Sequence, residues 1–292
     1  MRKLIQFFIF FLCTPASILC AQDDLLKELE DTTPKNEEYV FQTFKGTRLI
    51  NGQSVETKAK GTLEFIFAHR FGAINSGHYE MFGLDQAHVR LGLEYGITDR
   101  LGIGIGRSSL DKIKDGYLRY KVLKQQKGKR SFPVTVTAFG DVSYKSSPET
   151  NHASVDRVAY VGQLLIARKF SPQLSLQLMP TIVHRNAVDK LTDNNNLFAM
   201  GFGGRIKLSK SIAITSEYYY RVDPHVDTKY YNAIGFGIDI ETGGHVFQLV
   251  MTNTTGTTER ASITETSEKF WDGGIHFGFN VTRTFQLKKP KS

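Results

Sequence analysis

Along most of the chain, apolar residues alternate with polar ones. From Ala87 to Tyr95 the odd positions carry alanine, valine, leucine or tyrosine, whereas the even positions are charged, histidine or glycine. Successive side chains of a β-strand point to opposite faces, so this period of two predicts strands with one apolar and one polar face. About a dozen such strands are predicted, at 62–71, 87–95, 101–106, 118–123, 134–144, 158–170, 174–184, 198–208, 212–220, 234–241, 247–251 and 275–281.

The joins between these strands also alternate, between short and long. Outer-membrane barrels connect their strands by short periplasmic turns and longer external loops. Short joins lie at 98–100, 171–173, 209–211 and 242–244, and long ones at 72–83, 145–157, 186–196, 223–228 and 253–270. Two joins break the size rule, because 125–132 is long and basic where a short turn is expected, and 109–114 is short where a long loop is expected. We predict an all-β fold, a closed antiparallel up-and-down transmembrane barrel of about 12 strands.

A soluble β-sandwich is the alternative that alternation alone leaves open. Tyrosines cluster near predicted strand ends, at 218–220 and 230–231, where the aromatic girdles of a membrane barrel lie. Beyond the N-terminus no apolar run approaches the roughly 18 residues of a membrane-spanning helix. With 12% aromatic residues, 26 glycines and only 8 prolines, the composition suits a large sheet protein. These features favour the barrel.

Residues 1–21 have the order of charge, apolar run and small residues that is typical of a secretory signal peptide. Arg2 and Lys3 precede the apolar stretch, and Ala21 precedes an acidic segment, so cleavage is expected near Ala21. Both cysteines lie in this leader, and an acylated Cys20 is the alternative processing. The leader removes two of 37 basic residues and none of the 29 acidic ones, which leaves a net charge of +6. This mild surplus predicts no nucleic-acid binding.

Residues 22–60 are predicted to form an N-terminal periplasmic arm or plug, ahead of a barrel at 61–285 and a tail at 286–292. The acidic start at 23–33 suits a short helix or a disordered tail. From Phe44 to Val55 the arm combines apolar residues, including Ile50, with Arg48 and a turn-forming Asn51-Gly52 pair. We expect this stretch to dock in the lumen and to offer Arg48 to carboxylates such as Glu64 or Glu94.

Several segments together resemble a known family. The segments are Phe44-Lys45-Gly46-Thr47-Arg48, Ala68-His69-Arg70-Phe71-Gly72, Gly83 to Arg90 and Gly96 to Gly104. They are similar to an uncharacterised outer-membrane β-barrel family of Bacteroidota, a domain of unknown function. The resemblance covers nearly all of the chain after the leader. It implies an outer-membrane barrel, and it implies no activity, substrate or catalytic residue.

The polar positions of the predicted strands define the expected lumen. The predicted lumen-lining residues are Glu64, Arg70, His88, Arg90, Glu94, Arg119, Lys121, Asp141, Arg205, Lys207, Glu217, Arg221, Asp239 and His276. Basic residues outnumber acidic ones, and rings of Arg and Lys set the selectivity of anion pores. We therefore expect a passive or gated pore for small polar or anionic solutes. The alternative is a closed structural barrel, filled by its own side chains, that presents loops to partner proteins.

Other chemistries receive little support from the sequence. His69 and His88 approach one another if the first two strands pair, but no histidine spacing is diagnostic of zinc. Ser109, Asn151 and His152 lie near external loops without a motif that links them as a hydrolase site. Gly102, Gly104 and Gly106 fit the period of two as small lumen residues. We expect no enzyme activity, metal or cofactor; the expected partners are outer-membrane lipid, the barrel-assembly machinery and small polar solutes.

Overall fold

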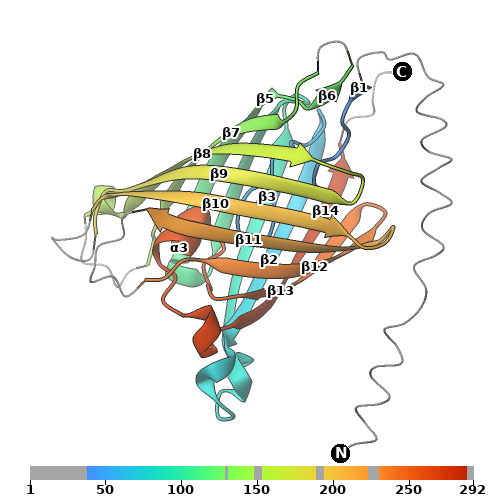
Figure 1. Cartoon of the computed structure of the whole chain (residues 1–292). Helices are drawn as coiled ribbons and strands as arrows, with labels where there is room; N and C mark the ends of the chain where they lie inside the picture. The colour runs from blue at the N-terminus through green and yellow to red at the C-terminus, as the bar shows by residue number, and fades with distance from the viewer. Residues whose placement is uncertain (1–37, 129–130, 148–152, 189–193, 223–229, 288–292) are drawn as a thin grey trace, which may run out of the picture.

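A computed structural model describes residues 38–128, 131–147, 153–188, 194–222 and 230–287. In this part of the chain, twelve antiparallel strands form a closed barrel (Figure 1). The barrel strands are β2 (Thr62–Ala73), β3 (Ala87–Gly96), β4 (Leu101–Ser108), β5 (Lys114–Leu123), β7 (Thr135–Tyr144), β8 (Val158–Lys169), β9 (Leu174–Arg185), β10 (Asn196–Lys207), β11 (Ile212–Val222), β12 (Ile234–Thr242), β13 (His245–Thr252) and β14 (His276–Gln286). Each pairs with the barrel strands before and after it, and β14 closes the ring against β2. The prediction of an up-and-down barrel of about twelve strands is confirmed.

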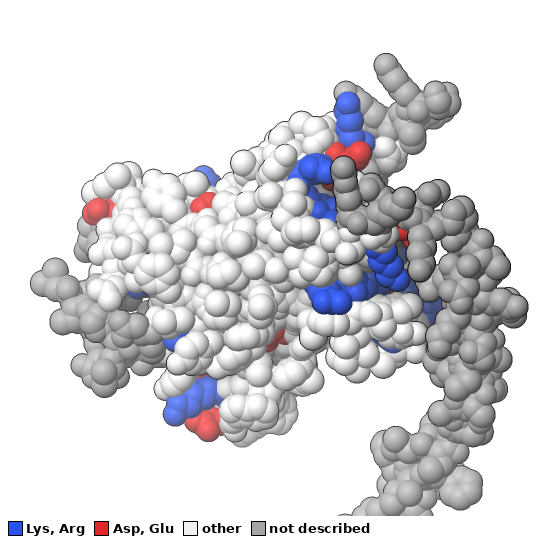
Figure 2. All heavy atoms as spheres, turned by 45° about the horizontal axis from the view of Figure 1, so that its top comes forward, with Lys and Arg blue, Asp and Glu red and all other residues white. Residues whose placement is uncertain are grey.

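The barrel wall has an apolar outer face and a polar inner face, because burial alternates along the strands as the sequence does. In β2 every second residue from Thr62 to Gly72 is buried, and the residues between them are half-buried. Exposed outer positions carry large apolar side chains, for example Leu91, Ile103 and Phe202. Figure 2 shows a broad flank with few charged residues, while lysines and arginines gather toward the ends.

The two ends of the barrel differ in the length of their connections. At one end, here called the short-turn end, the turns 97–100, 170–173, 208–211 and 243–244 join neighbouring strands, and β2 begins where β14 ends. At the opposite, long-loop end, longer connections join β2 to β3, β7 to β8, β9 to β10, β11 to β12 and β13 to β14. Short helical turns occur there at η2 (Ile74–Ser76), η3 (Met81–Gly83), η5 (Ser154–Arg157), α3 (Glu259–Thr264) and η6 (Phe270–Asp272). Among the described residues, no helix is long and apolar enough to cross a membrane.

The two joins that break the size rule have structural explanations. The long join after β5 contains β6 (Gln126–Lys127), which pairs with β1 (Glu38–Tyr39) outside the barrel (Figure 1). The extra length therefore forms an attachment for the N-terminal segment at the short-turn end. The short join before β5 closes as a single turn, η4 (Leu110–Lys112).

An arginine introduced on the outer face of the barrel should destabilise the protein more than an arginine introduced in a loop. Leu91 lies near the middle of β3 with about half of its surface exposed. Leu91→Arg is expected to destabilise the membrane-embedded barrel by about 2–4 kcal/mol, the cost of an arginine on the lipid face near the bilayer midplane. A heat-modifiability gel measures the folded fraction. Leu84→Arg is the control, since Leu84 is equally exposed but lies in the loop after η3; equal damage by both changes would contradict this assignment.

Candidate functional site: a plugged lumen

The strands point the predicted lumen residues inward. The side chains are buried at Glu64, Arg70, Arg90, Glu94, Arg119, Lys121, Asp141, Arg205, Glu217, Arg221, Asp239 and His276. His88 and Lys207 occupy inner-face positions too and are half-buried. Polar and charged side chains thus line most of the inner wall, whereas a buried apolar cluster that includes Val161, Leu165, Met179 and Val183 lines the part formed by β8 and β9.

Opposite charges on β3 and β5, which lie on either side of β4, pair across the inner wall. Arg90 on β3 forms a buried ion pair with Asp115 on β5, and Arg119 Nε lies 3.1 Å from Glu94 Oε1. The Tyr117 hydroxyl donates to Glu94 at 3.1 Å. The sequence analysis missed Asp115 because it began that strand at residue 118. Extending the strand by three residues toward the N-terminus would have included Asp115.

The glycines of β4 provide the room for these side chains. A Cβ atom at Gly104 would lie 2.1 Å from the Tyr117 ring, and one at Gly106 would lie 2.2 Å from Arg90 Nη2. At Gly102 the contact would be Arg119 Cγ at 3.2 Å. The stripe of small residues therefore lets large side chains from β3 and β5 lie flat over β4.

The N-terminal segment enters the lumen from the short-turn end as a hairpin, here called the plug hairpin (residues 43–55). Its tip is a tight turn in which the Leu49 amide donates to the Gly52 carbonyl at 2.9 Å. Phe44, Leu49, Ile50 and Val55 are each at most 2% exposed. Burying such side chains yields about 1.5–3 kcal/mol each, which opposes the entropy cost of ordering the segment.

One carboxylate of the barrel wall holds the tip of the plug hairpin. Glu217 on β11 accepts the backbone amides of Ile50, Asn51 and Gly52 at 3.1, 2.9 and 3.0 Å. Three converging amides form a concave anion site of the kind that turns provide. Here the anion is a side chain of the same chain, so the turn is fastened to the wall.

Other wall side chains bond the backbone of the plug hairpin along its length. Gln177 accepts the Val55 amide at 2.9 Å and donates to the Gln53 carbonyl at 2.7 Å. Arg119 donates to the carbonyls of Thr47 at 3.2 Å and Glu56 at 2.8 Å. These contacts satisfy backbone groups that would otherwise be buried without partners.

A second insertion enters from the long-loop end. The loop after β13, here called the inner loop (residues 253–268), carries α3, all six residues of which are buried. Thr258 caps α3 by accepting the Ala261 amide. Ile263 belongs to a buried apolar cluster with Val161 of β8 and Val183 of β9. At the rim, Glu265 pairs with Lys145 at 2.9 Å, which ties the inner loop to the end of β7.

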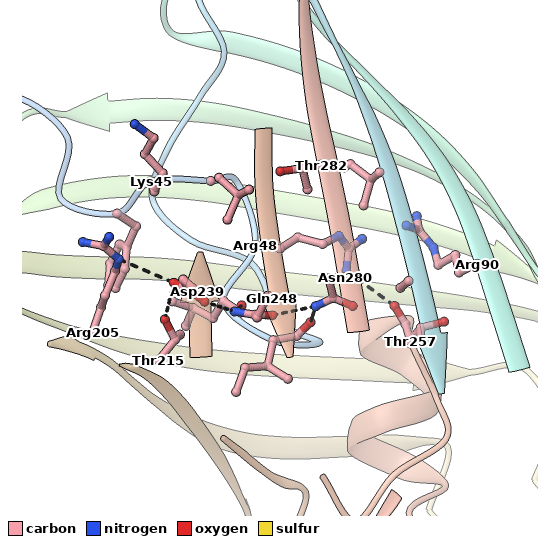
Figure 3. A pocket seen from close by; sticks show the side chains of 17 residues that line it. Lys45, Arg48, Arg90, Arg205, Thr215, Asp239, Gln248, Thr257, Asn280 and Thr282 are labelled. Carbon is pink, nitrogen blue, oxygen red and sulfur yellow. Dashed lines mark hydrogen bonds and ion pairs between the residues drawn. The ribbon is translucent and has the colours of Figure 1, made fainter. Parts of the chain in front are cut away.

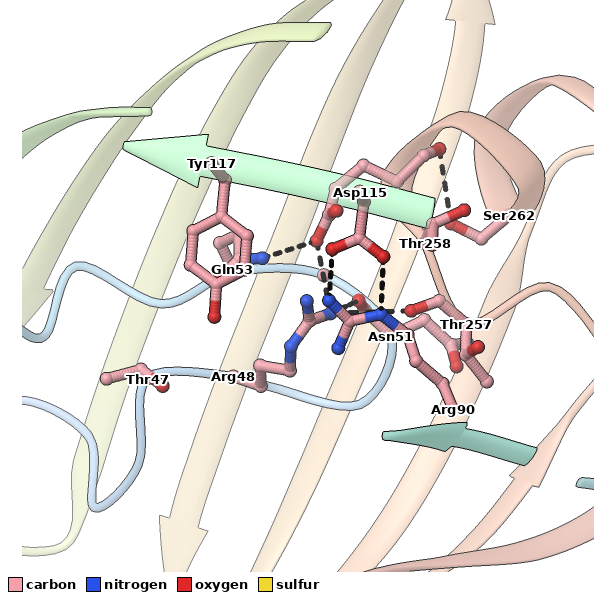
Figure 4. A network of polar contacts seen from close by, with 12 residues as sticks. Thr47, Arg48, Asn51, Gln53, Arg90, Asp115, Tyr117, Thr257, Thr258 and Ser262 are labelled. Atoms are coloured by element: carbon pink, nitrogen blue, oxygen red, sulfur yellow. Dashed lines mark hydrogen bonds and ion pairs between the residues drawn. The ribbon is translucent and has the colours of Figure 1, made fainter. Parts of the chain in front are cut away.

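The two insertions meet inside the barrel at Glu259 of α3. Figure 4 shows Arg48 and Gln53 of the plug hairpin beside Thr257 and Thr258 of the inner loop. Glu259 Oε1 lies 3.2 Å from Arg48 Nη1 and accepts a hydrogen bond from Gln53 Nε2 at 2.6 Å. The expectation that Arg48 would meet Glu64 or Glu94 is wrong. Those two carboxylates already have cations from the short-turn half, Lys58 at 2.5 Å and Arg119, whereas Arg48 lies at the tip of the hairpin and reaches farther in.

Little space remains beside the plug hairpin. The cavity between the hairpin and the wall has a volume of about 40 Å³. Figure 3 shows the side chains that line it. Four of the lining side chains are joined by hydrogen bonds. The Thr215 hydroxyl donates to Asp239 at 2.7 Å, the Gln248 amide donates to Asp239 at 2.6 Å, and the Asn280 amide donates to Gln248 at 2.7 Å. A cavity of this size holds a few water molecules and no larger solute.

A basic pocket of about 110 Å³ opens at the short-turn end, between the start of the plug hairpin and the wall. Its cations are Lys45, Lys169, Arg205 and Lys207, and its carboxylate is Glu241. Glu241 is shared by Arg205 and by Lys45 at 3.6 Å. Lysine and arginine therefore exceed acidic side chains in this pocket.

The structure does not bring the residues of the remaining candidate sites together. His69 and His88 sit on adjacent strands but on opposite faces of the wall, because His69 stacks on Phe279 outside and His88 follows the inner-face alternation. No group of three or more metal-ligating residues occurs among the described residues. Ser109 uses its hydroxyl to accept the Val89 amide at 2.8 Å. Asn151 and His152 lie outside the described residues, as do the expected leader, the acidic start of the arm and the tail from 288.

Sequence reasoning missed the residues that lock the insertions. Glu259 was assigned to an external loop, and its only signal is a threonine cap ahead of a short helical stretch. The alternation of the 174–184 strand places Gln177 on the lumen face, but nothing in the sequence indicated that it would bond to the plug hairpin, and no pattern pointed to Gln53. Their roles depend on which segment enters the lumen.

A closed barrel with an apolar outer face and a polar inner face is the architecture of transmembrane β-barrels. The chain belongs to the family described as the membrane bound beta barrel domain (DUF5777), which it matches over residues 44–285. The match begins at Phe44, so the family includes the plug hairpin together with the barrel.

Solved structures of similar fold include three channels. The NanC porin is 9% identical with a TM-score of 0.48, over 78% of this chain and all of that one. The KdgM porin is 9% identical with a TM-score of 0.47, over 77% and 99%. An outer membrane channel from Pseudomonas putida F1 is 10% identical with a TM-score of 0.49, over 79% and 98%. These values carry no argument about function, and no curated protein matches the sequence.

Proposed function

We propose that this protein is a gated pore of the bacterial outer membrane for small polar or anionic solutes, and that its gate is closed in this conformation. The observation that carries the proposal is a lumen with charged and polar side chains toward both ends and along most of its strands, which two insertions fill. A polar interior is typical of channel-forming barrels. A barrel needed only as a scaffold gains nothing from buried charges, because burying them costs several kcal/mol each.

Both insertions can leave without breaking the barrel. The plug hairpin enters and exits at the short-turn end, and the inner loop is attached by both stems at the long-loop end. Neither segment threads the wall. Many of their contacts are hydrogen bonds between side chain and backbone, which water can replace once the segment moves out.

The distribution of charge supports a preference for anions at the short-turn end. The basic pocket formed by Lys45, Lys169, Arg205 and Lys207 lies where a solute would leave the lumen. Cationic side chains at a constriction raise the local concentration of anions. No residue is proposed to act in catalysis, and the protein is proposed to be no enzyme.

The location and processing are part of the proposal. The apolar outer face supports lipid contact, and strands joined by short turns at one end support the outer membrane, with the short-turn end in the periplasm. Cleavage of a signal peptide near Ala21 and insertion by the barrel-assembly machinery are proposed on the leader and on the aromatic last strand, which includes Phe285.

A reversible disulfide tests the gate. A Cβ atom at Gly235 would lie 3.2 Å from Ile50 Cγ2, so Ile50→Cys with Gly235→Cys suits the spacing that a disulfide needs. In planar bilayers we expect stepwise conductance from wild type, silence from the oxidised double variant, and recovery after reduction. In a potassium chloride gradient, the reversal potential should show anion preference.

Each single-cysteine variant, treated in the same way, is the control and should conduct like wild type. Conductance of the oxidised double variant at the wild-type level would show that the plug hairpin is not the gate. Silence of wild type and of the reduced variant would contradict the pore and leave a closed barrel that presents loops to partners.

A further inference from the structure

A third cavity, larger than the two described above, lies at the long-loop end, away from the plug hairpin. Its volume is about 350 Å³, within the range of small-molecule sites. Three parts of the chain build it: the loop after β2 with Asn75 and Gln86, the strand ends with His88 and His276, and both stems of the inner loop, residues 253–255 and 265–268. This vestibule is the space that a solute arriving at the long-loop end would meet first.

The vestibule is lined by polar side chains whose hydrogen-bonding capacity is unused. Within the described part of the chain, the side chains of Gln86, Thr255, Ser267 and Glu268 make no hydrogen bond or ion pair. His276 uses Nδ1 on the Phe71 carbonyl at 3.0 Å, which leaves Nε2 for another partner. Amide, hydroxyl, carboxylate and imidazole groups together offer both donors and acceptors.

The charge of the vestibule differs from that of the basic pocket at the other end. Among the described residues that line it there is no lysine or arginine. Of its two carboxylates, Glu265 is paired with Lys145 and Arg260 at 2.9 and 2.7 Å, and Glu268 is the second. An anion would therefore find no cationic partner here. A cation would find one carboxylate among many neutral groups.

We propose that the vestibule binds an uncharged, polyhydroxylated solute, a small saccharide. Hydroxyl groups both donate and accept, so they match a lining of amides, hydroxyls, imidazoles and a carboxylate better than an ion does. The inference rests on the proposed pore in that it names the solute class for the first binding step. It also places that solute against both stems of the inner loop, on the outer side of α3.

The chain carries one tryptophan, which lies close in sequence to this site. Trp271 is the sole tryptophan, lies in η6 three residues after Glu268, and is 82% exposed. Tryptophan fluorescence and isothermal titration calorimetry of the folded full chain in detergent micelles would measure the binding of glucose, maltose and maltotriose. Succinate and putrescine are the charged comparison compounds. We expect saturable binding of at least one saccharide and none of the charged compounds.

Variants locate the binding to the vestibule. Gln86→Ala and Glu268→Ala should each weaken saccharide binding about five- to tenfold, the effect of losing one hydrogen bond to the ligand. Asp272→Ala is the matched control, an acidic residue in η6 whose partner is Lys269 at 3.6 Å and which lies outside the lining; its affinity should equal that of wild type.

The outcomes separate this site from the pore. The inference would be overturned if neither method detected saccharide binding, or if succinate or putrescine bound more tightly than the saccharides. It would also be overturned if Gln86→Ala and Glu268→Ala left saccharide affinity unchanged. Binding in a protein that never conducts would uphold the site and contradict the pore. Conductance without any saccharide binding would overturn the site alone.

Discussion

Replacing both insertions with flexible segments is expected to turn a barrel that opens only intermittently into one that conducts continuously. The change substitutes Gly/Ser segments of equal length for the plug hairpin, residues 43–55, and for residues 257–265 of the inner loop. The physical reason is that the two insertions fill the lumen from opposite ends and meet at Glu259. Single-channel recording in planar bilayers measures the open probability and the conductance.

The two single replacements rank the contributions of the insertions. Each should conduct less than the double variant, because the remaining segment still occupies half of the lumen. Replacement of the exposed residues 78–82 with the same Gly/Ser composition is the control and should leave conductance unchanged. A double variant that is folded by heat modifiability but carries no current would show that the wall itself is closed.

Glu217→Ala is expected to release the tip of the plug hairpin while the barrel stays folded. Three backbone amides, those of Ile50, Asn51 and Gly52, lose their common acceptor in a buried place. Leaving buried donors unsatisfied costs about 1–3 kcal/mol each, and partial rehydration reduces the sum, so local opening should become easier by about 2–4 kcal/mol. Amide hydrogen exchange at 50–52 should then accelerate about 30- to 1000-fold.

Thr215→Ala provides the matched comparison. Thr215 lies two residues before Glu217 on the same face of β11, but its hydroxyl donates to Asp239 at 2.7 Å and not to the plug hairpin. Exchange at 50–52 should remain slow in this variant. Equal acceleration in both variants would mean that general loosening of β11, rather than the lost carboxylate, frees the hairpin.

The barrel and its inner wall could be predicted from the sequence because the period of two acts locally. Each strand shows its own faces, so Arg90 and Glu94 could be assigned to the lumen and Leu91 to the lipid side without knowledge of their neighbours. The docking of the 44–55 stretch was expected from the same kind of local signal, an apolar group beside an Asn-Gly turn.

The partners of these residues could not be predicted in the same way. Arg48 was expected at Glu64 or Glu94 and instead meets Glu259, because the reach of the hairpin depends on the width and shear of the assembled barrel. The two histidines differ from Arg48, because the alternation that assigns Arg70 and His88 to the lumen already turns His69 outward, as its stacking on Phe279 shows.

By itself, the sequence determined the fold class, the membrane-facing and lumen-facing sides of each strand, and an arm able to enter the lumen. Tertiary structure alone decided that a loop from the other end also enters, that Glu217 fastens the hairpin, and that a polar vestibule forms at the long-loop end. The physical reason is sequence distance. The alternation of apolar and polar residues is a pattern between neighbouring positions. Glu217 and Asn51, in contrast, lie 166 residues apart, and Glu259 and Gln53 lie 206 residues apart, so only closure of the barrel brings them together.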